Sequence, residues 1–311
     1  MTNLLICSRD ALDYIEQIEQ AKIANLKIQI SPKSPGSIIN GKEVDVLLGE
    51  PELCISALPY CPNVKWVQST WAGIKPFVDS APHNFKLTGI KNCFGSQMRE
   101  YVFSYLLYFS RKIQTFNELQ SQQNWSQPSC SQLQGKTLGI LGMGSIGVEV
   151  AKTAKHFQME VIGVAKSARK LDCVDQFYGL SQLASFAHRL DYLVVLLPHT
   201  NETDKIIDQR FLSQLNEQCI LINAGRGQVI DEKALLHALS QNQLQAAVLD
   251  VFTEEPLPKG HPFWSLNNLY ISQHTAAISK PKEISNIFLE NFRLFQNKQT
   301  LMHLVDWKKG Y

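Results

Sequence analysis

The segment Thr137–Gly147, with the sequence TLGILGMGSIG, decides the fold of this chain. Its apolar start predicts a strand, and a G-x-G-x-x-G pattern follows directly, ahead of an amphipathic helix. In this order the glycines are typical of a dinucleotide-binding turn. Gly142 allows the tight turn, Gly144 lets the backbone approach a pyrophosphate, and Gly147 permits close packing of helix on strand.

On both sides of this segment, short apolar runs alternate with helical periodicity, the pattern of parallel strands joined by crossover helices. The predicted strands are Leu4–Cys7, Leu26–Ile30, Val44–Leu48, Val64–Gln68, Phe85–Ile90, Thr137–Leu141, Glu160–Val164, Tyr192–Leu197, Ile220–Asn223, Ala247–Val251 and Leu269–Ser272. We therefore predict an α/β protein with two doubly wound parallel-sheet domains, in which a Rossmann cofactor domain is inserted in a flavodoxin-like substrate domain.

The length of 311 residues agrees with two domains, at roughly 150 residues per domain. We place the cofactor domain at 97–279. The substrate domain is predicted to be discontinuous, over 1–96 and 280–311, because apolar residues at helical spacing between Ile284 and Phe295 predict a last helix that returns to it. Two chain crossings at one junction predict a hinge that closes on substrate.

The composition is that of an ordinary globular protein, with 44% hydrophobic and 19% charged residues. The net charge of +2, from 30 basic and 28 acidic residues, gives no global electrostatic case for nucleic acid or an anionic membrane. No apolar run reaches the roughly 18 residues of a membrane span, and the start of the chain lacks the features of a signal peptide. The seven cysteines form no C-x-x-C pair, so we expect reduced thiols and no metal site. These features favour a cytoplasmic protein.

A helix is predicted over 97–119, with almost no polar face around 102–109. Such a helix must be covered on more than one side. A second subunit is one candidate for this cover, and burial within the monomer is the alternative. The Gln/Ser-rich stretch 121–134 predicts a surface arm, and we expect a homodimer through the helix and the arm.

The residues that follow the second strand of the cofactor domain distinguish the two nicotinamide cofactors. An acidic residue about 20 positions after the first glycine would bind the ribose 2′-OH of NAD, but none stands at 162–165. The run KSARK follows instead, and its cations and hydroxyl suit a 2′-phosphate. We predict that NADP(H) is favoured over NAD(H), with Lys166, Ser167 and Arg169 binding the 2′-phosphate. A solvated lysine loop is the alternative.

Three polar residues stand where apolar strands finish. Arg226 lies in LINAGRG, Glu255 in LDVFTEEP and His274 in ISQHTAA. Because ligands of open α/β sheets bind outside the carboxyl ends of the strands, all three are predicted to point toward one crevice. Each alone reads as a surface, loop or capping residue. Together, after a dinucleotide turn, they predict an active site.

The chain resembles the D-2-hydroxyacid dehydrogenase family, in the group that includes bacterial glyoxylate/hydroxypyruvate reductases. The matching stretches are LGILGMGSIG, LVVLLPHTNET, LINAGRGQVIDEKALLHAL, LDVFTEEPLPKGHPFW and ISQHTAA, and more loosely VQSTWAGI, FGSQMREYV and VDWKKGY. The resemblance implies reduction of a short 2-keto acid of the glyoxylate or hydroxypyruvate type to the D-2-hydroxy acid, by hydride transfer from NAD(P)H. It gives His274 the role of general acid, Glu255 that of its partner, and Arg226 that of binding the substrate carboxylate.

The same resemblance implies further contacts. The loop Trp71-Ala72-Gly73-Ile74 would offer backbone N–H groups to the substrate carboxylate. Trp71 stands where a small residue is frequent in the family, so it either narrows the pocket toward short acids or packs beneath the loop. Asp250 would bind the nicotinamide carboxamide. The other predicted cofactor contacts are Ser145, Ile146, Pro198, His199, Thr200 and Ala224, although His199 fits a solvent-facing loop equally well.

Two other functions stay open on the sequence. One is a corepressor-like protein that senses NAD(P)H with little turnover, which the presence of all three polar residues and the near-neutral charge disfavour. The other is a formate- or phosphite-type dehydrogenase on the same scaffold, which would need a pocket closed to larger acids.

Overall fold

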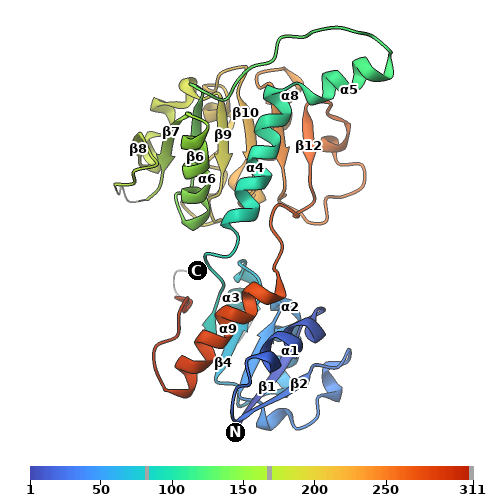
Figure 1. The fold of residues 1–311 in the computed structure, drawn as a ribbon, viewed down its shortest axis with the longest axis vertical. Coiled ribbons are helices and arrows are strands. Elements are labelled where there is room, and N and C mark those ends of the chain that lie inside the picture. Colours follow the sequence, from blue (N-terminus) through green and yellow to red (C-terminus); the bar gives the residue numbers. More distant parts are fainter. Residues whose placement is uncertain (81–83, 167–169, 308–311) are drawn as a thin grey trace. The chain divides into compact units, whose positions relative to one another are not determined.

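The computed structural model describes residues 1–80, 84–166 and 170–307. The chain divides into two compact units, Met1–Cys93 with Ser279–Tyr311 and Phe94–Ile278 (Figure 1). The predicted domain borders, after residues 96 and 279, differ from these units by a few residues.

The first unit holds a five-stranded parallel sheet in the order β2-β1-β3-β4-β5, the order of flavodoxin-like folds. Its strands are β1 (Thr2–Cys7), β2 (Leu26–Ile30), β3 (Val46–Gly49), β4 (Trp66–Ser69) and β5 (Lys86–Thr88). Its α-helices are α1 (Ala11–Gln20), α2 (Pro51–Ala57), α3 (Lys75–Ser80) and α9 (Pro281–Gln296). One face of the sheet packs on α2 and α3, and the other packs on α1 and α9.

The last helix, α9, completes the core of the first unit. Its Phe288 stacks on Trp66 of β4 with ring centroids 5.3 Å apart. The side chain of Asn291, fully buried, donates to Gln68 Oε1 at 3.1 Å and to the carbonyl of Met302 at 3.2 Å, and its Oδ1 accepts from the Met302 amide at 2.7 Å. A buried amide without these partners would be costly, so this network fixes the C-terminal segment on the first sheet.

The second unit holds a seven-stranded parallel sheet in the order β12-β11-β10-β9-β6-β7-β8. Its strands are β6 (Thr137–Leu141), β7 (Glu160–Val164), β8 (Gln176–Tyr178), β9 (Tyr192–Val195), β10 (Ile220–Asn223), β11 (Ala246–Leu249) and β12 (Leu269–Ile271). Its α-helices are α4 (Gly95–Ser110), α5 (Ile113–Ser121), α6 (Ser145–His156), α7 (Gln209–Leu212) and α8 (Glu232–Ser240). The strand order reverses between β6 and β9, and this switch point is where open α/β sheets bind ligands.

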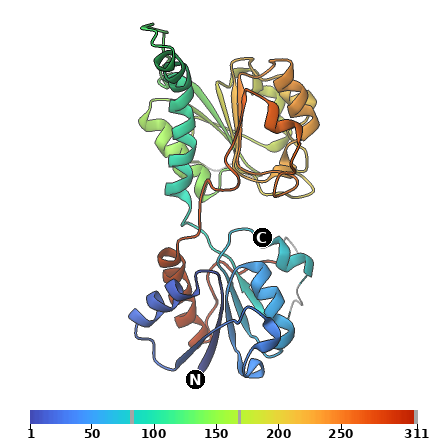
Figure 2. The ribbon, with the colours of Figure 1, turned by 90° about the vertical axis from the view of Figure 1, so that its right-hand side faces the viewer.

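Helices cover both faces of the second sheet (Figure 2). Apolar side chains of α4 and α6 form one core layer, and those of α7 and α8 form the other. Short 3-10 turns complete the two units, at Pro35–Ser37, Gly41–Glu43, Leu58–Tyr60, Leu180–Ser185, Ala187–Arg189, Gly227–Val229 and Pro262–Ser265. Two parallel sheets with covering helices confirm the predicted fold class.

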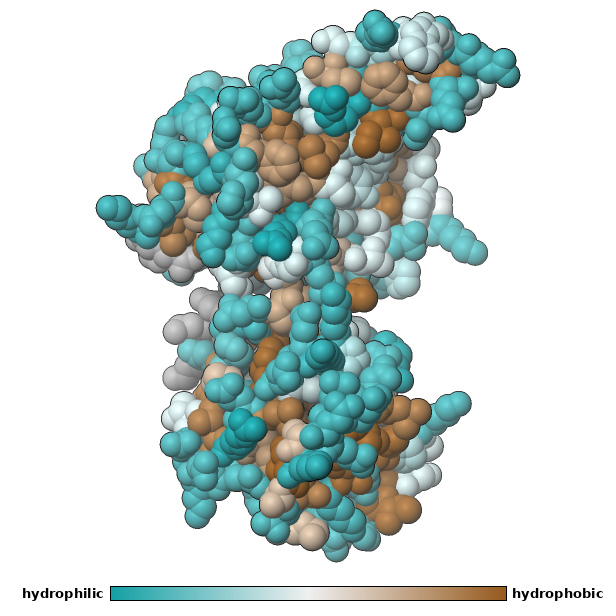
Figure 3. Space-filling view, in the orientation of Figure 1, coloured by the Kyte–Doolittle hydropathy of each residue, from teal (hydrophilic) through white to brown (hydrophobic). Residues whose placement is uncertain are grey.

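The predicted single helix over 97–119 is wrong. The structure has two helices there, because Lys112, between α4 and α5, has φ of 51°, a left-handed conformation that an α-helix cannot continue through. No residue of α5 is buried. Figure 3 shows apolar side chains at the surface of the second unit around α4 and α5.

Strand β8 was not predicted. Its three residues, QFY, are only partly buried, and so short a segment shows neither an apolar run nor an alternating pattern. Among the described residues, no helix combines the length and the apolar character that a membrane crossing requires.

Candidate active site

The glycine-rich turn joins β6 to α6 at the switch point of the second sheet. Gly142 has φ of 109°, and a Cβ there would lie 2.8 Å from the carbonyl carbon and oxygen of Leu196. A Cβ at Gly147 would lie 2.2 Å from the carbonyl oxygen of Gly142. At Gly144, in contrast, a Cβ would meet nothing within 4 Å, so the backbone faces open space.

This open backbone lies directly before α6. Ser145 and Ile146 are the first two residues of that helix, where backbone N–H groups have no partner within the helix. Such N–H groups, at the positive end of the helix dipole, bind phosphate. The turn therefore fits the pyrophosphate of a dinucleotide.

Lys166 follows β7, and its ammonium group forms an ion pair that the sequence did not indicate. Its Nζ donates to both carboxylate oxygens of Glu202, at 2.9 and 3.0 Å. Both side chains are exposed, by 75% and 59%. Ser167 and Arg169, the other residues predicted to bind a 2′-phosphate, lie outside the described residues.

The predicted residues Pro198, His199 and Thr200 lie in one loop after β9. The loop is organised by Thr203, whose buried hydroxyl donates to the carbonyl of Pro198 at 2.6 Å and accepts from the amide of Thr200 at 2.8 Å. His199 Nε2 lies 2.8 Å from Asp204 Oδ1. Thr203 and Asp204 were not among the predicted site residues.

Ala224 and Arg226 lie in the turn after β10, which the buried side chain of Asn223 fixes. Asn223 Nδ2 donates to the carbonyl of Arg226 at 3.1 Å, and its Oδ1 accepts from the amide of Gly225 at 3.1 Å. Arg226 Nη1 donates to the carbonyl of Gly225 at 2.6 Å. Burial lowers the pKa of the Arg226 guanidinium, and the charge of Glu255 opposes that effect.

His274 and Glu255 form a hydrogen-bonded pair. His274 Nδ1 lies 2.7 Å from Glu255 Oε2, and the other carboxylate oxygen accepts from the amide of Phe252 at 2.8 Å. The imidazole side chain is 54% exposed, and its Nε2 makes no hydrogen bond within the part of the chain that the structure describes. The geometry therefore leaves Nε2 available to a ligand.

The pair shifts the pKa of both groups. The hydrogen bond to Glu255 raises the pKa of His274 and outweighs the lowering by burial and by the charge of Arg226. Burial favours the neutral form of Glu255, but the hydrogen bonds from His274 and from the Phe252 amide hold the pKa of this carboxyl below its usual range. The arrangement therefore stabilises an imidazolium beside a carboxylate.

Asp250, predicted to bind the nicotinamide carboxamide, is buried at the end of β11 with 2% exposure. Its carboxylate accepts hydrogen bonds from Ser272 Oγ and from the amides of Thr275 and Ala276. These donors belong to the loop that carries His274. Sequence reasoning did not find this role.

The predicted substrate loop, residues 71–74, lies in the first unit after β4. The hydroxyl of Ser69 accepts from the amide of Trp71 at 3.1 Å and donates to its carbonyl at 3.0 Å. The Trp71 side chain is 37% exposed and Ile74 is buried. Arg226, Glu255 and His274 belong to the second unit.

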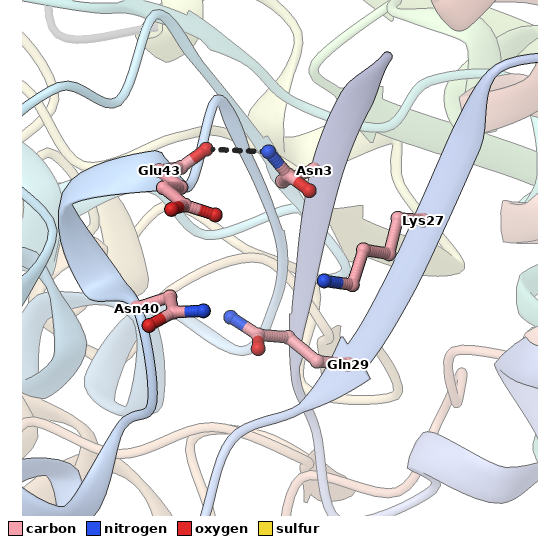
Figure 4. Close-up of a pocket in the computed structure, with 5 residues that line it drawn as sticks. All are labelled: Asn3, Lys27, Gln29, Asn40 and Glu43. Atoms are coloured by element: carbon pink, nitrogen blue, oxygen red, sulfur yellow. Dashed lines mark hydrogen bonds between the residues drawn. The ribbon is translucent and has the colours of Figure 1, made fainter.

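A separate small hollow opens in the first unit, and Figure 4 shows the polar side chains that line it. They are Asn3, Lys27, Gln29, Asn40 and Glu43, and Asn3 Nδ2 donates to the carbonyl of Glu43 at 2.9 Å. None of the predicted site residues lines it. Within the described ranges, the structure has no group of three His, Cys, Asp or Glu side chains suited to a metal ion.

The parallel sheet, its glycine turn at the switch point and the His–Glu pair with an arginine at the strand ends define a nicotinamide-dependent oxidoreductase. Residues 103–276 match the model of the D-isomer specific 2-hydroxyacid dehydrogenase NAD binding domain. The glyoxylate/hydroxypyruvate reductase A of Serratia proteamaculans is 39% identical over 215 residues, which are 69% of this chain and 69% of the relative. The chain therefore belongs to the D-isomer specific 2-hydroxyacid dehydrogenase family, as its sequence motifs indicate.

Two solved structures are similar over the whole chain. A D-isomer specific 2-hydroxyacid dehydrogenase family protein from Aeromonas salmonicida has a TM-score of 0.95 and 36% identity, with 98% of this chain and 99% of that chain covered. An NADPH-dependent glyoxylate/hydroxypyruvate reductase from Sinorhizobium meliloti, solved with NADP and sulfate, has a TM-score of 0.88 and 25% identity, with 100% of both chains covered. This protein is thus an NAD(P)-dependent 2-hydroxyacid dehydrogenase that reduces keto acids.

Proposed function

We propose that this enzyme reduces a short 2-keto acid of the glyoxylate or hydroxypyruvate type to the D-2-hydroxy acid, with His274 as the general acid. The observation that carries the proposal is the 2.7 Å contact of His274 Nδ1 with Glu255, which leaves Nε2 for the substrate. The names of the relatives from Serratia proteamaculans and Sinorhizobium meliloti support the substrate class.

When bound, a nicotinamide cofactor would supply the hydride for the keto carbon. The protein supplies the proton. His274 in its imidazolium form donates the Nε2 proton to the carbonyl oxygen, while the Nδ1 proton stays on the hydrogen bond to Glu255. Because the Glu255 carboxylate raises the pKa of His274, more of the imidazole is protonated near neutral pH than in an ordinary histidine. In the oxidative direction, neutral His274 takes the proton back.

Arg226 binds the substrate carboxylate and polarises the ketone. Its planar guanidinium matches a carboxylate with two parallel hydrogen bonds, which a lysine cannot reproduce. The family resemblance gives the backbone N–H groups of the loop 71–74 a role in binding the substrate carboxylate. Trp71 either narrows the pocket toward short acids or packs beneath the loop.

The cofactor is held by the glycine turn, Gly142 to Gly147, and by the amides of Ser145 and Ile146. The open space before Gly144 supports this assignment. Its remaining contacts are Pro198, His199, Thr200, Ala224 and Asp250.

The enzyme prefers NADP(H) to NAD(H). Lys166, Ser167 and Arg169 bind the 2′-phosphate, and no carboxylate stands at 162–165 to bind an unmodified ribose. The relative from Sinorhizobium meliloti was solved with NADP, which supports this choice.

The protein acts in the cytoplasm as a homodimer, formed through residues 97–119 and the arm 121–134. The exposed apolar side chains of this region support the dimer, since Ile113 is 42%, Phe116 41% and Trp125 93% exposed. A helix without buried residues is marginal by itself, and a partner subunit would give α5 the packing it lacks.

Activity assays with three short 2-keto acids test the proposed function. NADPH and NADH oxidation is followed with glyoxylate, hydroxypyruvate and pyruvate in separate reactions. We expect turnover with glyoxylate or hydroxypyruvate and a higher kcat/KM with NADPH. Cofactor binding without turnover on any of the three acids would contradict the proposal and favour an NAD(P)H-binding role.

A further inference from the structure

The turn that carries His274 has an unfavourable backbone conformation. Gln273 has φ of 57° and His274 has φ of 58°, so two successive residues with side chains adopt the left-handed region. This region is disfavoured for residues other than glycine, and such conformations persist only where surrounding contacts hold them. The contacts that hold this turn therefore decide where the imidazole lies.

Asp250 makes those contacts. Its backbone carbonyl accepts from the His274 amide at 2.6 Å. Its Oδ1 accepts from the Thr275 amide at 2.7 Å, and both carboxylate oxygens accept from the Ala276 amide at 3.1 Å. Three successive amides of the turn thus point at one buried residue.

Two hydroxyl groups extend this set of contacts away from the active site. Ser272 Oγ donates to Asp250 Oδ1 at 2.8 Å, and the hydroxyl of Tyr101 on α4 lies 2.7 Å from Ser272 Oγ. Ser272 has a single hydroxyl proton, and it donates this proton in the hydrogen bond to the Asp250 carboxylate. In the contact between Tyr101 and Ser272, the donor is therefore the Tyr101 hydroxyl. Burial raises the pKa of Tyr101 well above its usual value, which keeps this donor protonated.

We infer that Ser272 and Tyr101 are positioning residues for the reaction, which hold the His274 turn in place through the carboxylate of Asp250. The inference rests on the proposed role of His274 as general acid. Neither residue needs to touch the substrate. Both act because the Ser272 hydroxyl, held by Tyr101, fixes the orientation of the Asp250 carboxylate, and a carboxylate free to turn aligns less well with the amides of the turn.

The consequence concerns the contact between His274 and Glu255. When the turn relaxes, the imidazole is held less closely against Glu255, and the rise in its pKa is partly lost. Reduction requires protonated His274, so activity is present below this pKa and lost as the pH rises through it. Weakening the turn therefore moves the alkaline loss of activity to lower pH.

The test compares Ser272→Ala, Tyr101→Phe and the conservative Ser272→Thr in the full-length protein. The pH profile of kcat is measured with saturating glyoxylate and NADPH, and the Kd of NADPH is measured by fluorescence. We expect kcat to fall roughly tenfold in Ser272→Ala and roughly threefold in Tyr101→Phe, with the alkaline limb at lower pH in both. Ser272→Thr keeps the donor and should restore the limb, and the Kd of NADPH should stay within about twofold of the original.

Tyr192→Phe is the matched control. Tyr192 is buried in the same unit, and its hydroxyl makes no hydrogen bond within the described residues. The substitution Tyr192→Phe removes a buried tyrosine hydroxyl that has no contact with Asp250, so the pH profile of kcat should be unchanged in this variant. An equal shift of the limb in this control would overturn the inference.

Two further results would also overturn it. One is a Ser272→Ala variant that has a lower melting temperature but an unshifted alkaline limb in its pH profile of kcat. That result would mean that Ser272 has a structural role alone. The other is a raised Kd of NADPH with an unshifted limb, which would mean that Ser272 acts on cofactor binding. His274→Gln is measured beside these variants. If it keeps full activity, the proposed general acid itself is wrong, and that failure is distinct from failure of the positioning role.

Discussion

The two nitrogen atoms of the His274 imidazole have different roles. Nδ1 is occupied by Glu255, which fixes the orientation of the ring and favours its protonated form. Nε2 is left for proton transfer. This division makes the residue-scale predictions specific, because the proton donor, its partner and the carboxylate-binding cation can be altered one at a time.

Replacing His274 with glutamine removes the acid and keeps a side chain that donates to Glu255. We expect kcat for keto acid reduction to fall about 10²–10⁴-fold, the usual contribution of a positioned general acid. Steady-state kinetics check this, with His237→Gln, an exposed histidine on α8, as the control. A loss below tenfold would contradict the role of His274.

Replacing Glu255 with glutamine keeps the size of the side chain and removes its charge. Since Glu255 raises the pKa of His274, the variant should have the lower, more ordinary value. The sign follows directly: protonated His274 is the active form for reduction, so the alkaline loss of activity moves to lower pH. Glu254→Gln, the neighbouring exposed carboxylate, should leave the pH profile of kcat unchanged.

Lys166 and Glu202 should have opposite effects on the choice of cofactor. Lys166→Ala removes a cation predicted to bind the 2′-phosphate and should lower the ratio of kcat/KM for NADPH to that for NADH roughly tenfold. Glu202→Gln removes the carboxylate that competes for Lys166. Because exposed ion pairs contribute about 0.2–1 kcal/mol, we expect this ratio to rise less than about fivefold.

Kinetics with both cofactors at low and high salt check this pair of variants. Lys152→Ala, which breaks a surface ion pair on α6, is the control. A ratio unchanged in Lys166→Ala would show that the other cations of the loop carry the preference.

At the scale of elements, the sequence predicts strands well where apolar side chains form a run or alternate with polar ones. Leu26–Ile30, Thr137–Leu141, Glu160–Val164 and Ile220–Asn223 have the same bounds in the structure as in the prediction. The prediction of element bounds fails where the end of an element is set by the backbone conformation of a single residue. Apolar periodicity continues through Lys112, and only the left-handed backbone there ends α4.

The position of α9 depends on a side chain that no periodicity marks. Asn291 interrupts the apolar face of the helix, yet it is fully buried and bonded to Gln68 and Met302. Asn291→Ala leaves these partners unsatisfied and should lower the free energy of unfolding by about 1–3 kcal/mol. Urea denaturation measures this, and Asn286→Ala, exposed on the same helix, should change stability by less than about 0.5 kcal/mol. Equal effects of the two variants would contradict the role of the network.

At the scale of the whole molecule, the proposed dimer would give α5 and the arm 121–134 the packing that they lack within one chain. Trp125→Glu places a charge in the predicted interface and should raise the dimer dissociation constant at least roughly tenfold. Sedimentation velocity at several protein concentrations measures it. Leu12→Glu, which alters an exposed apolar side chain on α1, is the control. A dimer of unchanged affinity in Trp125→Glu would place the interface elsewhere.

Some residues of the candidate site could be predicted from the sequence, and their hydrogen-bond partners could not. The glycine turn and the three residues Arg226, Glu255 and His274 follow from local motifs and from the rule that strand ends share one edge. The partners of those residues do not. Glu202 on Lys166 and Ser272 on Asp250 depend on which side chains the packed loops bring together, and spacing along the chain does not encode that.

The place of α9 in the first unit also has a consequence for synthesis of the chain. Residues 1–93 are synthesised before 281–302, and until then the face of their sheet that carries Trp66 is covered by α1 alone. The inserted unit, 94–278, is complete earlier. Since domains fold as units during translation, we expect the nucleotide-binding unit to fold before the first unit, whose core is complete only after α9 has been synthesised.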